Sequence, residues 1–493
     1  MAISRKKVLY LQGETFYLTL KNRAIMKDRF FNLILACCLF SLTVYAGEAR
    51  YIFYFIGDGM GPNQVLSTEM YLAELEGRIS RRQLAMTQFP YSGQAATFSS
   101  SNGITDSSAA GTALSSGKKT TNGTLGLDDE GKPVHTIAEI LKERGWAVGI
   151  TTSVSIDHAT PGAFYAHVKK RNEYYMIGRQ LAESNFDFFG GATFYQPYDP
   201  NADKSECLYD LAEQNRYTIA RGYSDYNDKK YDAEKMILIQ SFEGLEKDYK
   251  GGGMIPYAID KQPDDLTLPQ ITTAAIDFLQ RNDRFFLMVE GGAIDWACHS
   301  NDAATVIKEV IEFDDAIKVA LDFYYAHPDE TLIVITADHE TGGMALGNSD
   351  YTLNLQLLQN QHLSVDQLSD KLKKLYVDNG ASLKWDAVKQ VLQADLGFYN
   401  TVEISADDEK MLKNAFKKLK KNKQNVKTLY KNLNKLADTA VRLIDKKAKV
   451  GWTTGSHSAA AVPVFAIGAG AEQFTGWQDN TQIMPKMLKS AKE

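Results

Sequence analysis

Short apolar runs separated by longer amphipathic segments form the main pattern along this chain. Each run is almost continuously hydrophobic, which is typical of strands buried on both faces of a parallel sheet. The runs that we expect to form such parallel strands are residues 51–56, 147–152, 285–289, 331–336 and 462–467. They predict a buried sheet as the centre of the fold.

The segments between these runs carry helical spacing. Thr136 can cap a helix that has Ile137, Ile140 and Leu141 on one face and ends at Gly145. Strands that alternate with helices predict an α/β fold, in which a large, mostly parallel central sheet has helices on both faces. A further helix is marked by Ile307, Val310, Ile311, Ile317 and Leu321.

The strand pattern stops between about residues 350 and 450, where apolar residues recur at helical spacing. We therefore predict a single catalytic domain over residues 47–493 that is interrupted by a helical insertion. The apolar residues that indicate its helices are Leu368, Leu372 and Leu375 in one stretch and Leu429, Leu433 and Leu436 in another.

The second half of this insertion is rich in lysine and includes Lys417, Lys418, Lys420 and Lys421. We favour a solvated helix face for these side chains, and a surface for a partner or a polyanion is the alternative. The whole chain of 493 residues has a formal net charge of -6. It therefore has no general attraction to nucleic acid or to anionic membranes, and an anionic ligand must be held by local positive charge, such as a metal site.

The N-terminal segment has the features of a secretory signal peptide. Lys27 and Arg29 precede an apolar run over residues 30–44, and Ala46 ends a small-x-small cleavage pattern. We expect residues 1–46 to be an extension and signal peptide, cleaved near Ala46 to give a periplasmic or secreted protein. Met26 lies at a natural translation start, which leaves open whether the protein begins there or at Met1.

The sequence argues against two alternative interpretations of this segment, a membrane anchor and a lipoprotein. A membrane anchor requires about 20 apolar residues, whereas this run is short and contains Asn32. A lipoprotein attached at Cys37 is disfavoured because apolar sequence continues well beyond that residue. The mature chain keeps only Cys207 and Cys298, too few for a disulfide framework.

Three carboxylates follow predicted strands. Asp58, Glu290 and Asp338 each come one or two residues after a buried run. Open α/β sheets bind ligands beyond the carboxyl ends of their strands. We therefore expect these three side chains to converge at one edge of the sheet.

Histidines and carboxylates occur together at spacings that suit metal ligation. Asp295 and His299 lie four residues apart, so one helical turn can present both to one ion, and His339 directly follows Asp338. His457 precedes the last predicted strand. Ser107 begins a run of small residues and fits a nucleophile at a helix N-terminus, where backbone N–H groups favour a phosphate anion.

Taken in order, these motifs resemble those of the alkaline phosphatases. The resemblance extends from Tyr51 to about Gly470, excluding the helical insertion, and implies the large central sheet of that family. The motifs are Gly57-Asp58-Gly59-Met60-Gly61, Asp106-Ser107, His158-Ala159-Thr160-Pro161 with Arg171, Val289-Glu290-Gly291, Thr336-Ala337-Asp338-His339 and Gly455-Ser456-His457.

The resemblance implies hydrolysis of phosphate monoesters through a covalent phosphoserine at Ser107, with Arg171 binding the substrate phosphate. It implies two zinc ions and one magnesium ion. Asp295, His299 and His457 would hold one zinc ion, while Asp58, Asp338 and His339 would hold the other. Asp58 would also reach the magnesium ion, together with Thr160 and Glu290.

The same resemblance implies that the partners are small phosphate monoesters. From the net charge we expect no nucleic acid as a specific partner, and from the signal peptide no stable membrane span after cleavage. A homodimer is suggested by the family alone.

Two positions depart from the best-known bacterial form of the family. His158 replaces an aspartate near the magnesium ion, and Trp296 replaces a lysine. His158 could reach the third metal directly or through water, so we include it among the metal-site residues and leave the identity of the third metal open.

Two competing functions are weighed against this one. A phosphodiesterase or sulfatase on the same scaffold would typically use threonine or a modified cysteine and lack the magnesium site, so Ser107 with Thr160 and Glu290 argues against it. A catalytically silent phosphate-binding or adhesive protein would lack a ligand or the nucleophile, and none is missing. We expect surface or structural roles for His135, His167, His327, His362 and Cys298.

Overall fold

The structure is a computed structural model that describes residues 47–202, 204–241, 253–348, 350–420, 425–429 and 432–493. The chain divides after Gly47, and the second unit, Glu48–Glu493, is compact. The predicted signal peptide, its cleavage site and Lys421 lie outside the described residues. None of the helices in the described ranges has both the length and the apolar composition that crossing a lipid bilayer requires.

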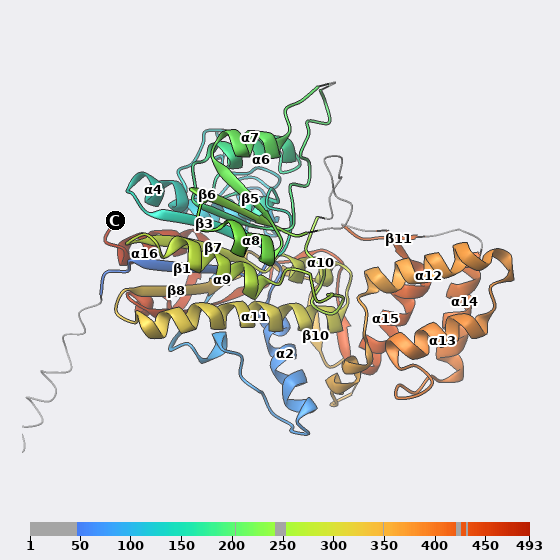
Figure 1. Cartoon of the computed structure of the whole chain (residues 1–493). Helices are drawn as coiled ribbons and strands as arrows, with labels where there is room; N and C mark the ends of the chain where they lie inside the picture. Colours follow the sequence, from blue (N-terminus) through green and yellow to red (C-terminus); the bar gives the residue numbers. More distant parts are fainter. Residues whose placement is uncertain (1–46, 203, 242–252, 349, 421–424, 430–431) are drawn as a thin grey trace, which may run out of the picture. The chain divides into compact units, whose positions relative to one another are not determined.

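A large sheet forms the centre of the second unit (Figure 1). Within the described residues it has ten strands, in the order β16-β2-β15-β8-β1-β7-β3-β4-β6-β5. Their bounds are β16 (Gly476–Asp479), β2 (Tyr91–Ala96), β15 (Val462–Gly468), β8 (Thr331–Thr336), β1 (Tyr51–Ile56), β7 (Phe285–Glu290), β3 (Ala147–Thr152), β4 (Phe188–Gly191), β6 (Lys235–Ile239) and β5 (Tyr217–Arg221). Small paired strands lie outside this sheet: β9 (Glu340–Thr341), β10 (Met344–Leu346), β11 (Asn425–Lys427), β12 (Asn432–Asn434), β13 (Val450–Trp452) and β14 (His457–Ser458).

The central strands run parallel and end in register. Ile56 at the end of β1 is paired with Glu290 of β7 on one side and with Thr336 of β8 on the other. Thr152 at the end of β3 is in turn paired with Glu290. The four strand ends therefore form one edge, and the turns that follow them project side chains into the same region.

One predicted strand runs in the opposite direction to our expectation. β15 pairs antiparallel with both β8 and β2, so the expectation that residues 462–467 form a parallel strand is wrong. A strand buried on both faces has the same apolar composition in either orientation, and the direction depends on how the chain enters the sheet. The sheet as a whole remains mostly parallel, as predicted.

Helices cover both faces of the sheet (Figure 1). Phe53 and Phe55 of β1 contact Phe323 and Phe313 of α11, whereas Tyr54 points to the other face and contacts Phe164, which follows α5. The helices of this part are α2 (Pro62–Leu75), α3 (Ser107–Ser116), α4 (Ile137–Glu143), α5 (Ala159–Gly162), α6 (Tyr174–Glu183), α7 (Leu208–Gln214), α8 (Tyr223–Lys229), α9 (Leu268–Leu279), α10 (Ala293–His299), α11 (Ala303–Ala326) and α16 (Ile483–Ser490). Short 3₁₀ turns are η1 (Met86–Gln88), η4 (Ala471–Phe474) and η5 (Asn480–Gln482).

The two predicted helices have the expected positions. α4 begins after Thr136, whose hydroxyl accepts from the backbone N–H of Glu139 while the Glu139 carboxylate accepts from that of Thr136. This reciprocal capping box satisfies two backbone donors that a helix start leaves unpaired. Gly145 follows the helix with φ of 82°, a left-handed conformation that glycine adopts at low cost.

The insertion is largely helical. It contains α12 (Val365–Asn379), α13 (Trp385–Leu396), α14 (Ala406–Lys420) and α15 (Lys435–Lys447), with η2 (Leu355–Asn360) and η3 (Gly380–Ser382). The four helices form a cluster with its own apolar core, in which Leu368 and Leu372 are fully buried (Figure 1). Lys417 and Lys418 are exposed on α14, in agreement with a solvated face.

The second predicted helix of the insertion is partly wrong. Leu429 follows β11 and is 58% exposed, Leu433 lies in β12, and only Leu436 lies in a helix, α15. β11 and β12 pair antiparallel, so the leucine spacing there does not describe a helical face.

The insertion is joined to the sheet-bearing part through Asp302. This carboxylate caps α11 by accepting from the backbone N–H of Thr305, and it also accepts from the Gln361 side chain and the Val365 backbone. Because Asp302 is buried, losing these donors would leave an unpaired charge. α10 precedes Asp302 in the chain and carries part of the site described next.

Candidate active site

The three carboxylates predicted to converge do lie together at the carboxyl edge of the sheet. Asp58, Glu290 and Asp338 are all fully buried. The turn after β1 requires Gly59, which has φ of 72° and where a Cβ atom would lie 2.9 Å from Oγ1 of Thr341. The backbone N–H of Gly59 donates to Oδ1 of Asp338 at 3.1 Å, which ties the turn after β1 to the turn after β8.

Ser107 is the first residue of α3, as its small-residue context predicted. Asp106 is the N-cap, and its carboxylate accepts from the backbone N–H of Ala109 at 3.0 Å. The Ser107 side chain is buried, and its Oγ lies 3.2 Å from Nε2 of His339. The serine hydroxyl therefore lies between a helix N-terminus, which favours negative charge, and the histidine that follows β8.

The three imidazoles of the site present Nε2 toward the carboxylates. Nδ1 of His299 lies 2.7 Å from the carbonyl of Gly455, and Nδ1 of His457 lies 2.8 Å from the carbonyl of Thr105. A carbonyl can only accept, so each Nδ1 must carry the proton and each neutral ring has its lone pair on Nε2. His339 follows the same scheme, because the Thr341 hydroxyl donates its own proton to Asp295 and therefore accepts from Nδ1 of His339 at 3.2 Å.

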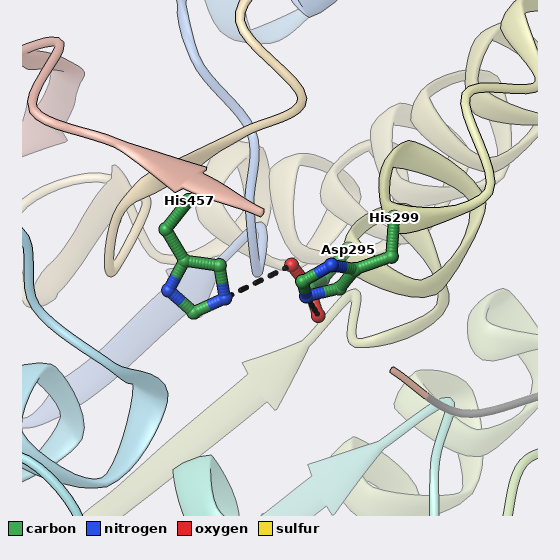
Figure 2. A group of neighbouring side chains, drawn as sticks. All are labelled: Asp295, His299 and His457. Carbon is green, nitrogen blue, oxygen red and sulfur yellow. Dashed lines mark ion pairs between the residues drawn. The ribbon is translucent and has the colours of Figure 1, made fainter. Parts of the chain in front are cut away.

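Asp295 and His299 lie on one face of α10, as their spacing predicted, and His457 approaches them from β14 (Figure 2). Nε2 of His299 is 3.3 Å from Oδ2 of Asp295, and Nε2 of His457 is 3.7 Å from Oδ1 of the same residue. Thr341 donates to Oδ1 of Asp295 at 2.6 Å and so fixes the carboxylate. This pattern of an imidazole with a second hydrogen bond behind it is typical of metal ligands.

The described residues contain three groups of side chains whose ligand atoms are close enough to hold a metal ion. Asp58 belongs to two of them. The groups are Asp295 with His299 and His457, Asp58 with Asp338 and His339, and Asp58 with His158 and Glu290. Thr160, expected near the third group, donates its hydroxyl to Oδ2 of Asp58 at 3.3 Å.

The charges in this region are unbalanced without a cation. Burial, and then repulsion by Asp338, raises the pKa of Asp58 well above its usual range. Burial raises the pKa of Glu290 to about 8. Burial would also raise the pKa of Asp338, but the adjacent His339 outweighs it and the pKa lies below its ordinary value. Divalent cations would stabilise all three carboxylates in the ionised form.

Arg171 extends toward the same region from the loop before α6. Its Nη1 donates to Oδ2 of Asp106 at 3.2 Å, and its Nη2 donates toward Nε2 of His158 at 3.5 Å. Burial, and then the Arg171 charge, lowers the pKa of His158 to about 3. Arg171 thus lies beside Ser107 through Asp106 and beside the third group through His158.

Several residues that shape the site were given no role from the sequence, although Asp106 was part of a quoted motif. Asp106 caps α3 and holds Arg171, and Thr341 orients both Asp295 and His339. Thr152 donates to the Glu290 carboxylate from the end of β3. Asp106 carried a detectable signal, because an aspartate before a small-residue helix is a typical N-cap. The two threonines carried none, since only the fold brings them near the site.

The residues expected to have other roles lie outside the three groups. His135 is exposed beside Glu143, and His167 bridges the Gly126 carbonyl and the Glu139 carboxylate. His327 packs against Tyr51 and Phe323. The remaining two, His362 and Cys298, are exposed and fully buried respectively, and the Cys298 sulfur accepts from the side chain of Gln64.

A serine at a helix start, clustered carboxylates and imidazoles, and a mostly parallel sheet define a hydrolase of the metal-dependent type. The family model described as alkaline phosphatase matches residues 49–186 and 248–493. The chain therefore belongs to the alkaline phosphatase family, whose members are phosphoric monoester hydrolases.

Characterised relatives match along most of their length. The chain is 32% identical to alkaline phosphatase 3 of Bacillus subtilis over 451 residues, which covers 90% of this chain and 89% of the relative. It is 28% identical to the repressible alkaline phosphatase of Saccharomyces cerevisiae, covering 87% of this chain and 77% of the relative.

Solved structures of alkaline phosphatases resemble this protein over most of its chain. The cold-active alkaline phosphatase of a Shewanella species matches with a TM-score of 0.73 at 28% identity, covering 89% of this chain and 99% of that one. The enzyme of Thermus thermophilus has the same fold, with a TM-score of 0.74 at 24% identity over 90% of this chain and 91% of that one. A histidine-to-aspartate variant of TAB5 alkaline phosphatase, with magnesium bound in its M3 site, matches with a TM-score of 0.63 at 25% identity, covering 90% of this chain and 99% of that one.

Proposed function

We propose that this protein hydrolyses phosphate monoesters through a phosphoserine at Ser107, with two zinc ions and one magnesium ion held by the three groups of ligands. Asp295, His299 and His457 would hold the first zinc ion. Asp58, Asp338 and His339 would hold the second, and Asp58, Thr160 and Glu290 the magnesium ion, with His158 beside it or bound through water.

The donor atoms fit these ions. Oδ1 of Asp58, Oδ2 of Asp338 and Oε1 of Glu290 are buried and accept no hydrogen bond from the described residues. Buried carboxylate oxygens without donors are costly unless a cation satisfies them. Imidazole with carboxylate suits zinc, and carboxylates with a hydroxyl suit magnesium.

The observation that carries the proposal is the position of the Ser107 hydroxyl next to His339, with Asp58 shared between two of the ligand groups. In the first step, Oγ of Ser107 loses its proton and bonds to phosphorus, and the bond from phosphorus to the ester oxygen breaks to release the alcohol. In the second step, water attacks the phosphoserine, and Ser107 regains its proton as inorganic phosphate leaves.

The protein's own groups prepare this displacement. Arg171, oriented by Asp106, can bind two phosphate oxygens with its planar guanidinium. The N-terminus of α3 favours the negative charge that develops beside Ser107. When bound, the metal ions supply positive charge that makes the deprotonated serine and hydroxide available near neutral pH and stabilises the phosphate oxygens.

The magnesium group also favours a monoesterase over the rival functions. A phosphodiesterase or sulfatase on this scaffold is not expected to need Thr160 and Glu290 as ligands of a third metal ion. Here Thr160 donates to Asp58, and Glu290 belongs to the same ligand group as Asp58. The TAB5 variant with magnesium in its M3 site gives a precedent for magnesium in a related enzyme.

We also propose one catalytic domain over residues 47–493, export after cleavage near Ala46, and a homodimer. N-terminal sequencing of the exported protein tests the cleavage site, and sedimentation analysis tests the homodimer.

Metal analysis combined with a paired assay tests the function. The purified enzyme is analysed for zinc and magnesium, and hydrolysis of nitrophenyl phosphate and of bis-nitrophenyl phosphate is measured before and after chelation. We expect the monoester to be strongly preferred, and activity to be lost on chelation and restored by zinc with magnesium. Activity that survives complete metal removal, or a preference for the diester, would contradict the proposal.

A further inference from the structure

A cavity of about 520 Å³ opens beside the proposed phosphate site. Arg171 lies in its wall, and the other lining residues are Ser155, His158, Asn172, Tyr174, Tyr195, Gly253, Trp296 and Leu429. Its volume lies within the range of sites that hold small molecules. Because Arg171 would bind the phosphate, a group attached to that phosphate can extend into the cavity beside it.

The tyrosine wall of this cavity is held in position by a buried carboxylate. Both oxygens of Asp157 lie 2.9 Å from the backbone N–H of Tyr195, and Oδ2 also accepts from Gln196. The rings of Tyr174 and Tyr195 contact each other with centroids 4.7 Å apart, and Tyr195 remains 40% exposed. Asp157 thus fixes the backbone at Tyr195, Tyr174 packs against the Tyr195 ring, and both residues line the cavity.

Trp296 forms another part of the wall, next in sequence to Asp295 on α10. A Cβ atom on Gly253 would lie 2.5 Å from the Trp296 ring, so the glycine backbone packs closely against the indole. The Gly253 carbonyl accepts from the backbone N–H of Ser155 at 2.7 Å. The edge of the indole also contacts His158, with ring centroids 6.1 Å apart. Trp296 is thus fixed between the third ligand group and the cavity.

The electrostatic character of the lining also selects a ligand class. Among the described residues that line the cavity, Arg171 is the only side chain with a permanent charge. Ser155, His158 and Asn172 add polar groups, whereas Tyr174, Tyr195, Trp296 and Leu429 supply aromatic and apolar surface. Aromatic surface contacts a flat ring more favourably than a polyol or a charged group.

We propose that this cavity binds the leaving alcohol and selects phosphate monoesters whose alcohol carries a flat aromatic or heteroaromatic ring. The ring would stack against Trp296 or the Tyr174–Tyr195 pair while Arg171 holds the phosphate. This inference rests on the proposed monoesterase function and adds the class of substrate. Aryl alcohols and nucleosides share this chemistry, and matched substrates distinguish them.

Two substrate pairs isolate the ring from the reacting centre. AMP and ribose 5-phosphate have the same primary phosphate ester and differ in the base. Benzyl phosphate and cyclohexylmethyl phosphate are similar in size and differ in aromaticity. We expect kcat/KM to be about tenfold higher for the aromatic member of at least one pair, the size of effect that stacking of one base produces. A preference confined to AMP identifies nucleosides, and one confined to benzyl phosphate identifies aryl alcohols.

Variants then assign the preference to the wall. Trp296→Ala and Tyr195→Ala should each lower kcat/KM more for the aromatic member than for its partner, mainly through KM, and so reduce the ratio severalfold. Tyr231→Ala, which removes a tyrosine that is 79% exposed and does not line the cavity, is the matched control and should keep the wild-type ratio.

The outcomes separate this inference from the proposed function. If ribose 5-phosphate and cyclohexylmethyl phosphate are hydrolysed as well as their aromatic partners, or if the ratio survives in both wall variants, the substrate class is wrong and the monoesterase proposal stands. If none of the four esters is hydrolysed by the metal-loaded enzyme, the proposed function itself fails.

Discussion

The hydroxyl of Ser107 lies 3.2 Å from Nε2 of His339, although 231 residues separate them in the chain. The His339 ring also stacks on that of His457, with centroids 3.5 Å apart. Ser107 begins a helix, His339 follows the end of β8, and His457 begins β14. The account of function depends on this convergence, because an in-line displacement needs the nucleophile within reach of the groups that stabilise charge.

Asp106 has two functions that substitutions can separate. Asp106→Ala removes both the cap of α3 and the anion that holds Arg171, so it should lower the free energy of unfolding by about 1–2 kcal/mol and lower kcat/KM roughly tenfold to hundredfold. Urea unfolding and a monoester assay measure the two effects.

Asp106→Asn is the matched variant. Asparagine is also a good N-cap, so stability should stay near that of the wild type, but the neutral amide no longer holds Arg171 by charge and kcat/KM should still fall. A wild-type KM in both variants would show that substrate binding by Arg171 does not depend on Asp106.

The third ligand group should respond to a carboxylate in place of an imidazole. His158→Asp adds an oxygen donor beside Asp58 and Glu290, so the affinity for magnesium should rise roughly tenfold, because magnesium prefers oxygen ligands. Magnesium titration of the chelated, zinc-restored enzyme measures it. His135→Asp, at an exposed position beside Glu143 and outside the three ligand groups, is the control and should leave the affinity unchanged. Equal or weaker binding by His158→Asp would argue against magnesium at this group.

Stability should depend on pH through Glu309, which lies away from the proposed metal ligands. Burial, and then repulsion by Glu312, raises its pKa from 4.5 to about 8, while Lys261 and the Ala258 backbone act in the opposite direction. Between these values the folded state keeps a proton that the unfolded state releases. Stability is therefore lost as the pH rises through this window, by at most about 1.4 kcal/mol per pH unit from this group.

Glu309→Gln tests this dependence because the amide is neutral and can still accept from Ala258. The stability of the variant relative to the wild type should increase from pH 5 to pH 8, as measured by urea unfolding. Glu213→Gln, on the surface of α7, should parallel the wild type. A constant difference between Glu309→Gln and wild type across this range would exclude Glu309 as the source.

Strands with long apolar runs were predictable from the sequence, but their direction was not. Residues 51–56 and 331–336 are mostly apolar and were recognised as β1 and β8. β15 is equally apolar but antiparallel, a property of the connection rather than of the strand. β4 is a short strand, Phe188–Gly191, that contains two glycines, so its composition did not indicate a strand.

The sequence predicted those parts of the site whose residues lie close together in the chain. The pairs Asp295 with His299 and Asp338 with His339 are close in sequence, and their grouping followed from local spacing. Tyr195 could not be recognised as part of a cavity, because Asp157 and the folded loop bring it there. Leu429 was assigned to a helix from spacing alone, but it follows β11 and lines the cavity.

Trapping of the covalent intermediate identifies the nucleophile of the enzyme. The metal-loaded enzyme is incubated with labelled inorganic phosphate at acid pH, denatured and digested, and the labelled peptide is identified by mass spectrometry. We predict one phosphoserine at Ser107 in the wild type and in Ser108→Ala, whose lost hydroxyl only donates to Asp106, and no label in Ser107→Ala. Label retained by Ser107→Ala, or found on another residue of the wild type, would contradict the account.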